Sequence, residues 1–231
     1  MNKIDIFYRI CEKRTAIHGA SRPEWFSKEK CLTSFLNSVE NAKEYVNSFT
    51  FIHDGPEGEL YELIKNYNIL KINEGNHLGS MTQTYNYASN FKGNYFFAED
   101  DYLYLPDCVE KIAISIDELD LLTPYDHLAG YDPGFYFNQP RLVNDERKSF
   151  VADKEWKISE FACYTYSISN KLFHAKKDII TSEYCTRGDL DFYRMMYANG
   201  HPLWVPVPAL ATQVDDYMSP NVDWEEFNKT L

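Results

Sequence analysis

Three consecutive carboxylates, Glu99, Asp100 and Asp101, directly follow the apolar run at residues 95–98. Side chains alternate along a strand, so a strand that continued through the triplet would place Glu99 and Asp101 on one face and Asp100 on the other. Adjacent carboxylates repel unless a cation is present, and clustered oxygen ligands suit Mg²⁺ or Mn²⁺, which bridge to substrate phosphates. A solvated acidic loop, or an acidic helix start before Pro106, explains the same residues equally well.

Polar residues also follow two other apolar runs. Asp54 closes the run at residues 49–52, inside the turn sequence His-Asp-Gly-Pro, and residues 73–76 (Asn-Glu-Gly-Asn) close the run at residues 69–72. Ligands of open parallel sheets bind beyond the carboxyl ends of the strands. We therefore expect these polar residues at the same edge of a sheet as the acidic triplet.

The elements that must position these residues alternate along the first 125 residues. Short apolar runs predict strands, and apolar residues at helical spacing predict helices between them. Strand–helix alternation favours βαβ units, and nearly all-apolar strands favour a sheet that is covered on both faces. The fold class predicted is α/β, with a mostly parallel central sheet flanked by helices. The predicted strands are 4–10, 49–52, 69–72, 95–98 and 119–122, and the helices are 29–46, 60–67, 81–91 and one that begins after Pro106.

The second half of the chain is less regular. Residues 126–157 hold several Gly, Pro and charged residues, which predicts a long loop or a hairpin insertion. Residues 161–168 are rich in β-formers, 189–198 predict a helix that Asn-Gly ends, and 203–207 predict a final strand before a polar tail. No repeat, linker or low-complexity tract divides the chain, so residues 1–231 are expected to form one domain.

Composition excludes several classes of protein. The 231 residues carry 23 basic and 35 acidic side chains, a net charge of −12, so nucleic acid is not an expected partner. No apolar segment reaches 18 residues, so no membrane span is expected, and the charged N-terminal run predicts a strand rather than a signal peptide. Five scattered cysteines without a CxxC pair indicate a reduced, cytoplasmic compartment. The motifs GxGxxG, GxxxxGK[ST] and GxSxG are absent, which excludes Rossmann, P-loop and α/β-hydrolase enzymes.

Four segments, in order, resemble family-2-like glycosyltransferases with the GT-A fold. NYFFAEDDYLYLPD is similar to the family's strand and DxD-type metal-binding segment, and FTFIHDG to its second strand. INEGNHLGSMTQTYNYA resembles the turn and helix near the donor, and RGDLDFYRMMYANGHPLWVP the segment that carries the catalytic base. The resemblance covers roughly residues 3 to 213.

The resemblance implies roles for particular residues. Asp101 would hold the metal, together with Gln213, which stands where the family often has a metal-binding His. The catalytic base would be Asp189, with Asp191 as the second choice, because Gly188-Asp189 replaces the usual acidic pair. A first-turn helix acid is the other explanation of Asp189. The residues expected on the donor side are Tyr8, Arg9, Arg22, Asp54, Asn76, Glu99 and Asp100.

These roles have different expected contacts. Asp54 would contact the nucleotide base, and Arg9 or Arg22 would pair with the phosphates, unless each arginine forms only a surface ion pair. Residues 1–125 would form the nucleotide-sugar and metal half, and residues 126–231 the acceptor half. The loop at residues 132–152 is expected to be mobile and to close over the donor. The aromatic residues expected to shape the acceptor side are Tyr131, Phe135, Tyr136, Trp156, Tyr164 and Trp204.

The resemblance thus implies a glycosyltransferase that depends on Mn²⁺ or Mg²⁺ and inverts the anomeric centre. It would move a sugar from a nucleotide-diphosphate donor, UDP- or dTDP-sugar favoured and GDP-sugar allowed, to an acceptor hydroxyl of a glycan or another molecule. One alternative is a sugar-1-phosphate nucleotidyltransferase, although the loop CEKRTAIHGASRP lacks the glycines of that class. Another is a catalytically silent protein that binds a nucleotide sugar or a glycan.

Overall fold

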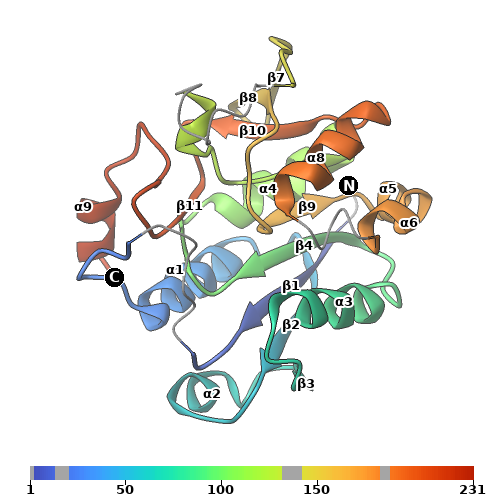
Figure 1. The fold of residues 1–231 in the computed structure, drawn as a ribbon. Coiled ribbons are helices and arrows are strands. Elements are labelled where there is room, and N and C mark those ends of the chain that lie inside the picture. The colour runs from blue at the N-terminus through green and yellow to red at the C-terminus, as the bar shows by residue number, and fades with distance from the viewer. Residues whose placement is uncertain (1–2, 14–20, 132–141, 183–187) are drawn as a thin grey trace.

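The computed structural model describes residues 3–13, 21–131, 142–182 and 188–231. In these ranges a nine-stranded sheet has the order β3-β2-β1-β4-β9-β6-β10-β8-β7 (Figure 1). Its first part is parallel: β2 and β4 both run parallel to β1 and flank it, and β3 runs parallel to β2. The bounds of these strands are β1 Ile4–Ile10, β2 Val46–Asp54, β3 Ile69–Ile72 and β4 Asn94–Glu99.

The C-terminal half supplies the rest of the sheet. Strand β9 runs antiparallel between β4 and β6, β10 is parallel to β6, and β8 and β7 form an antiparallel hairpin at the edge. A second, two-stranded antiparallel sheet pairs β5 with β11. The bounds are β5 Tyr102–Tyr104, β6 Leu121–Leu122, β7 Lys148–Val151, β8 Lys154–Ser159, β9 Tyr166–Ile168, β10 Leu203–Val207 and β11 Ala211–Gln213.

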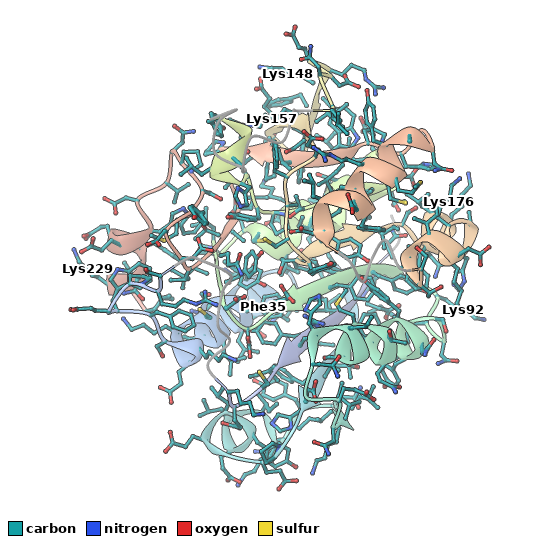
Figure 2. All side chains as sticks on the ribbon, viewed as in Figure 1. Phe35, Lys92, Lys148, Lys157, Lys176 and Lys229 are labelled. Carbon is teal, nitrogen blue, oxygen red and sulfur yellow. The ribbon has the colours of Figure 1, made fainter. Side chains whose placement is uncertain are left out.

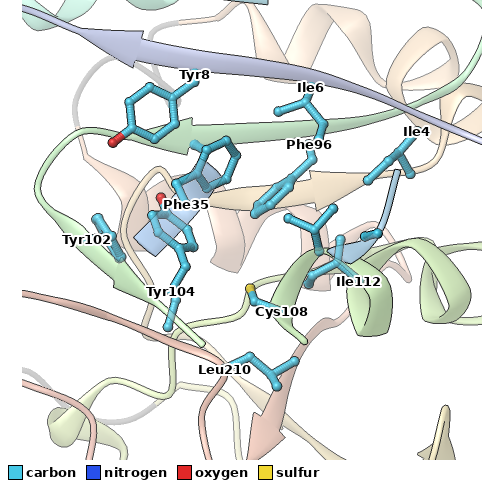
Figure 3. Close-up of a cluster of buried hydrophobic side chains, with 14 of the residues drawn as sticks. Ile4, Ile6, Tyr8, Phe35, Phe96, Tyr102, Tyr104, Cys108, Ile112 and Leu210 are labelled. Carbon is cyan, nitrogen blue, oxygen red and sulfur yellow. The ribbon is translucent and has the colours of Figure 1, made fainter. Parts of the chain in front are cut away.

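Helices cover both faces of the large sheet, because its strands are apolar on both sides. One core cluster joins Ile4, Ile6 and Tyr8 of β1 to α1, α2 and α4 (Figure 3). The other joins Phe7 of β1 to α3, α5, α6 and α8. The helices are α1 Lys28–Asn41, α2 Glu59–Ile64, α3 His77–Ala88, α4 Cys108–Leu119, α5 Asn170–Ala175, α6 Lys177–Ile180, α8 Asp189–Ala198 and α9 Trp224–Lys229, with a 3₁₀ turn η1 at Leu128–Gly130.

Charged and apolar side chains divide between the outside and the inside of this framework. Lys92, Lys148, Lys176 and Lys229 lie at separate places around the outline of the molecule, whereas Phe35 lies within it (Figure 2). None of the helices in the described ranges is long and apolar enough to cross a membrane.

The α/β prediction is confirmed, and the bounds of β1, β3, β10 and α8 match the sequence pattern. The prediction of a strand over residues 119–122 is wrong at its start. Helix α4 continues to Leu119, and Asp120, with a φ of 60°, ends it, so only two residues remain for β6. Strand β10 is not the last one, because β11 and α9 occupy the part of the chain expected to be a polar tail. Within the long insertion, β7 and β8 form the hairpin.

Candidate active site

The strand order reverses direction at β1. The chain moves from β1 outward to β2 and β3, and it then returns to place β4 on the other side of β1. In open parallel sheets such a switch point opens a crevice between the loops at the carboxyl ends of the two strands. Here those ends carry Arg9 and Glu99, which lie opposite each other in the register of β1 and β4. The acidic triplet therefore begins at the place where this type of sheet binds its ligands.

Each carboxylate of the triplet is paired with a basic side chain of the protein. Arg9 binds Glu99, Lys28 Nζ lies 2.7 Å from Asp100 Oδ2, and Arg22 Nη2 lies 2.6 Å from Asp101 Oδ2. All six side chains are largely buried. The repulsion argument for a metal ion therefore does not hold on its own, because three protein cations already balance the three charges.

The three carboxylates do not alternate between two faces of a strand. Strand β4 ends at Glu99, and Asp100 and Asp101 form a turn before β5. The side chain of Asp100 instead accepts the backbone N–H of Cys11 at 2.9 Å, and Lys28 also donates to the Cys11 carbonyl at 2.8 Å. Asp100 thus ties the start of α1 to the end of β1. The prediction that Glu99 and Asp101 share a strand face is wrong because β4 ends at Glu99 and a turn follows it.

The two residues expected to bind a metal, Asp101 and Gln213, lie side by side. Antiparallel pairing of β5 with β11 sets Gln213 opposite Tyr102, next to Asp101 in the chain. Gln213 Nε2 donates to Asp101 Oδ2 at 3.0 Å, and the N–H of Val214 donates to the Asp101 carbonyl at 2.9 Å. Among the described residues, Asp101 Oδ1 is buried and has no hydrogen-bond partner.

This geometry allows one kind of metal site. Within the described ranges, no three His, Cys, Asp or Glu side chains are placed to hold an ion, so these residues form no all-protein cage. Mg²⁺ and Mn²⁺ sites often use one or two protein oxygens and complete the shell with water and phosphate. The unpaired Asp101 Oδ1 fits that pattern. Gln213 turns its Nε2 toward Asp101, so its carboxamide oxygen, which faces Cys163, could join such a shell only after the amide turns over.

Asp189 begins α8 and is half-buried, whereas Asp191 is exposed. Burial raises the pKa of Asp189 to about 6, and the Leu190 N–H, which donates at 2.8 Å, and the Cys163 thiol oppose the rise. Cys163 Sγ also lies 3.3 Å from Gln213 Oε1, so its single S–H can donate to either of the two oxygens but not to both at once. Asp189, Cys163, Gln213 and Asp101 therefore form a continuous series of neighbours that joins the predicted base to the predicted metal ligand.

Asp54 and Asn76 lie at the carboxyl ends of β2 and β3, as expected. Asp54 Oδ1 accepts the N–H groups of Glu74 and Gly75 at 2.9 and 3.1 Å, and Asn76 caps α3 by accepting the N–H of Gly79 at 2.8 Å. His77, which follows Asn76, connects this loop to the triplet. Its carbonyl accepts a hydrogen bond at 3.4 Å from Arg9, the partner of Glu99. Asp54 and Asn76 therefore hold the loop that borders the crevice.

The prediction that Tyr8 contacts the donor does not agree with the structure. Tyr8 is fully buried, and its ring lies 4.6 Å from that of Phe35 and 5.5 Å from that of Phe51 (Figure 3). The alternation of β1 directs Tyr8 into the core beneath α1, one position before Arg9. Trp156, which was expected on the acceptor side, is likewise fully buried, and its N–H donates to the Val151 carbonyl at 3.2 Å.

The other residues expected to shape the acceptor side are partly described. Tyr131 and Trp204 are at least partly accessible, and the ring of Tyr164 lies 4.4 Å from that of His77, at the border of the crevice. Phe135 and Tyr136, and residues 132–141 of the loop expected to close over the donor, lie outside the described residues.

Sequence reasoning missed three residues of the site. Lys28 neutralises Asp100, and His77, whose pKa burial and nearby Arg9 lower to about 3, contacts Arg9 through Nδ1 at 3.1 Å. Asp215 is buried, which raises its pKa to about 6, and Arg22 opposes the rise. The signals for Asp215 and His77 were their positions, two residues after Gln213 and directly after Asn76; Lys28 carried none.

Similarity in sequence does not identify the family: no family model matches the chain, and no curated protein does. Solved structures of similar fold do match. A CMP-2-keto-3-deoxy-manno-octonic acid synthetase in complex with CTP is 12% identical over 99% of this chain and 98% of its own, with a TM-score of 0.55. A nucleotidyl transferase from Methanothermobacter thermautotroptrophicus is 11% identical over 89% and 87%, with a TM-score of 0.50. A structure assigned to a nucleotide-diphospho-sugar transferase of Desulfovibrio desulfuricans G20 is 8% identical over 89% and 80%, also with a TM-score of 0.50. The chain thus has the GT-A-like fold of nucleotidyl and nucleotide-sugar transferases.

Proposed function

We propose that the protein is a metal-dependent, inverting glycosyltransferase that moves a sugar from a nucleotide-diphosphate donor to an acceptor hydroxyl. One observation carries the proposal. The acidic triplet lies at the switch point of the sheet, and Cys163 and Gln213 link its last member, Asp101, to the half-buried carboxylate of Asp189. This arrangement supplies a phosphate-side charge cluster and a separate base at one edge of the sheet.

The donor side uses groups from residues 1–125. Asp54 Oδ1 is occupied by two backbone donors, which leaves Oδ2 to accept the N3–H of a uracil or thymine ring. This is why we favour a UDP- or dTDP-sugar over a GDP-sugar. Arg9 and Arg22 stand at the triplet, and their planar guanidinium groups match phosphate oxygens.

Asp101 and Gln213 would hold the metal. When bound there, Mg²⁺ or Mn²⁺ supplies positive charge to the departing diphosphate. The chain's own contribution is to hold the two ligand side chains in register through the pairing of β5 with β11. Asp101 is buried, which strengthens each charge interaction at the site.

The acceptor side uses residues 126–231. With a pKa of about 6, Asp189 is ionised at neutral pH and can take the proton of the attacking hydroxyl. In this proposal Asp189 activates the acceptor hydroxyl for attack on the anomeric carbon from the side opposite the leaving diphosphate. Displacement from that side inverts the anomeric centre.

A sugar-1-phosphate nucleotidyltransferase is the second candidate. The observation that favours it is the convergence of Arg9, Arg22 and Lys28 on one cluster, since three cations suit a triphosphate. That enzyme would release pyrophosphate from a nucleoside triphosphate and a sugar 1-phosphate. A sugar transferase would release a nucleoside diphosphate from a nucleotide sugar and no pyrophosphate.

The first test compares two neighbouring acids. We expect Asp189→Asn to lower sugar transfer or donor hydrolysis by roughly 10²-fold or more, since a positioned base contributes that much. The exposed Asp191→Asn is the matched control and should stay near the wild-type rate. The assay uses UDP-, dTDP- and GDP-sugars with Mn²⁺, and it measures nucleoside diphosphate and pyrophosphate separately. Equal loss in both variants would contradict Asp189 as the base, and pyrophosphate as the product would support the second candidate.

A further inference from the structure

Arg22 is bound more completely than a surface arginine would be. Nη2 donates to Asp101 Oδ2 and Nη1 to the Val214 carbonyl, both at 2.6 Å, and the guanidinium carbon lies 4.4 Å from the centre of the Phe26 ring. The side chain is only 7% exposed. Its Nε is buried and has no hydrogen-bond partner in the described part of the chain. A buried donor without a partner costs free energy, so the Arg22 guanidinium would gain from a position in which Nε is also hydrogen-bonded.

Asp101, like Arg22, has a buried polar atom without a hydrogen-bond partner among the described residues. Oδ2 accepts from both Arg22 and Gln213, whereas Oδ1, also buried, accepts from no group among the described residues. An ion on Oδ1 would share one carboxylate with the guanidinium on Oδ2. Two cations so close in a poorly solvated site repel strongly.

We propose that Arg22 is the resident counter-ion of Asp101, and that a divalent cation binds Asp101 only by displacing it. This inference rests on the proposed function, because it concerns the metal that the function requires. Displacement frees the guanidinium to pair with the diphosphate of the donor. Metal and donor would then each favour the binding of the other, since the ion releases the group that the phosphates need.

The displacement would also loosen a tie between distant parts of the chain. Arg22 and its neighbour Ser21, whose N–H donates to Asp216 Oδ2 at 2.7 Å, join residues 21–26 to the segment that follows Gln213. Loss of the Arg22 contacts leaves only the Ser21 bond among these. The amide groups of residues 21–26 should therefore exchange hydrogen faster when the metal is bound.

The test measures Mn²⁺ binding without nucleotide, from the loss of the free-ion electron paramagnetic resonance signal. We expect Arg22→Gln to bind Mn²⁺ at least about tenfold more tightly than wild type, because a charge-assisted hydrogen bond no longer competes. Lys28→Gln is the matched control: it removes one buried positive charge beside Asp100. Lys28→Gln should tighten Mn²⁺ binding by less than about threefold, since Arg22 still occupies the Asp101 carboxylate. In an Asp101→Asn background, Arg22→Gln should have no effect.

Equal affinities of Arg22→Gln and Lys28→Gln would overturn the inference, as would weaker binding by Arg22→Gln or no saturable Mn²⁺ binding by any variant. Wild-type protein provides a second measurement that needs no substitution: Mn²⁺ should speed amide exchange in residues 21–26, and slower or unchanged exchange would contradict displacement. The proposed function can fail separately. Sugar transfer without Mn²⁺ would contradict the metal dependence of the proposed function and leave the displacement of Arg22 to the binding measurement. Mn²⁺ competition without sugar transfer would support this inference and count against the transferase.

Discussion

Asp189 and Asp191 stand two positions apart on the first turn of α8, and their surroundings differ. Asp191 faces solvent, whereas Asp189 is held against Cys163 at the end of the sheet. Burial raises the pKa of Asp189 to about 6, and the Leu190 N–H and the Cys163 thiol keep it from rising further. A base with that pKa is mostly ionised at neutral pH yet still holds a proton well enough to accept one during reaction.

The first residue-scale prediction concerns pH. Asp189 must be deprotonated to act as a base, so kcat/KM should fall below a pH of about 6, tenfold for each further pH unit. Cys163→Ala removes a hydrogen-bond donor to the carboxylate, which raises its pKa, so the acid limb should move to higher pH. Cys163→Ser keeps a donor and is the matched control. If the acidic limb of the kcat/KM profile does not move to higher pH in Cys163→Ala, Asp189 is not the titrating group.

The partners of the acidic triplet show what a sequence can and cannot predict at the residue scale. The triplet itself was visible because three acids follow an apolar run. The ion pairs that neutralise the triplet could not be predicted, since Lys28 lies 72 residues from Asp100 and Arg22 lies 79 residues from Asp101. The phosphate role expected for Arg22 placed it at the site but did not predict an ion pair with Asp101. Contacts over such separations depend on the tertiary fold and leave no local pattern.

At the scale of elements, another buried carboxylate, that of Asp5, fixes the opposite end of the parallel strands. Asp5 is fully buried and accepts from Asn47 Nδ2 at 2.7 Å, Ser48 Oγ at 2.6 Å and the Gly93 N–H at 2.8 Å. It thus joins β1 to β2 and to the start of β4. Gly93 is required there, because a Cβ would lie 2.6 Å from Asp5 Oδ2 and 2.7 Å from the Lys3 carbonyl oxygen.

Asp5→Ala should therefore lower the free energy of unfolding by about 2–4 kcal/mol, because it removes three hydrogen bonds that join the strands. The measurement is urea unfolding followed by circular dichroism. The exposed Glu44→Ala serves as a control for the loss of one acidic side chain, and we expect a change within about 0.5 kcal/mol. A loss below about 1 kcal/mol for Asp5→Ala would show that water satisfies these donors.

Long apolar runs predicted elements well, and short strands did not follow from the sequence. Strands β1, β3 and β10 match their runs. Of these, only β1 is a buried parallel strand between two parallel neighbours, which needs continuous apolar residues. Strands β6, β9 and β11 have only two or three residues, too few to show a period. Their pairing is decided by neighbours in the sheet, so the position of Gln213 beside Asp101 could be expected only from the family resemblance.

At the scale of the whole molecule, charge is distributed unevenly. The chain has a net charge of −12, but the triplet and its three partners are balanced within the crevice. Asp189 and Asp215 add negative charge beside these balanced pairs, so an anionic donor meets no excess of protein cations at the site. A divalent cation would add the positive charge that such a donor requires.

Ligand binding should be visible as a change in global stability. A donor present at about 100 times its Kd adds about 2.7 kcal/mol, roughly 5–10 °C in Tm for a domain of this size. We expect such a shift with one of UDP-, dTDP- or GDP-sugar, only with Mn²⁺ present, and none with Asp101→Asn. A shift of equal size without Mn²⁺ would show that the protein's own cations bind the diphosphate.

The position of β9 has a consequence for how the chain folds as it leaves the ribosome. Strand β9, at Tyr166–Ile168, separates β4 from β6, although β4 and β6 are made first. The nascent N-terminal βαβ units can assemble early, but the edge of β4 stays open until about 70 further residues have been synthesised. An open, apolar strand edge is a site of mispairing. Newly made chains would therefore depend on chaperones during that interval, and slower translation after β6 would lengthen the exposure.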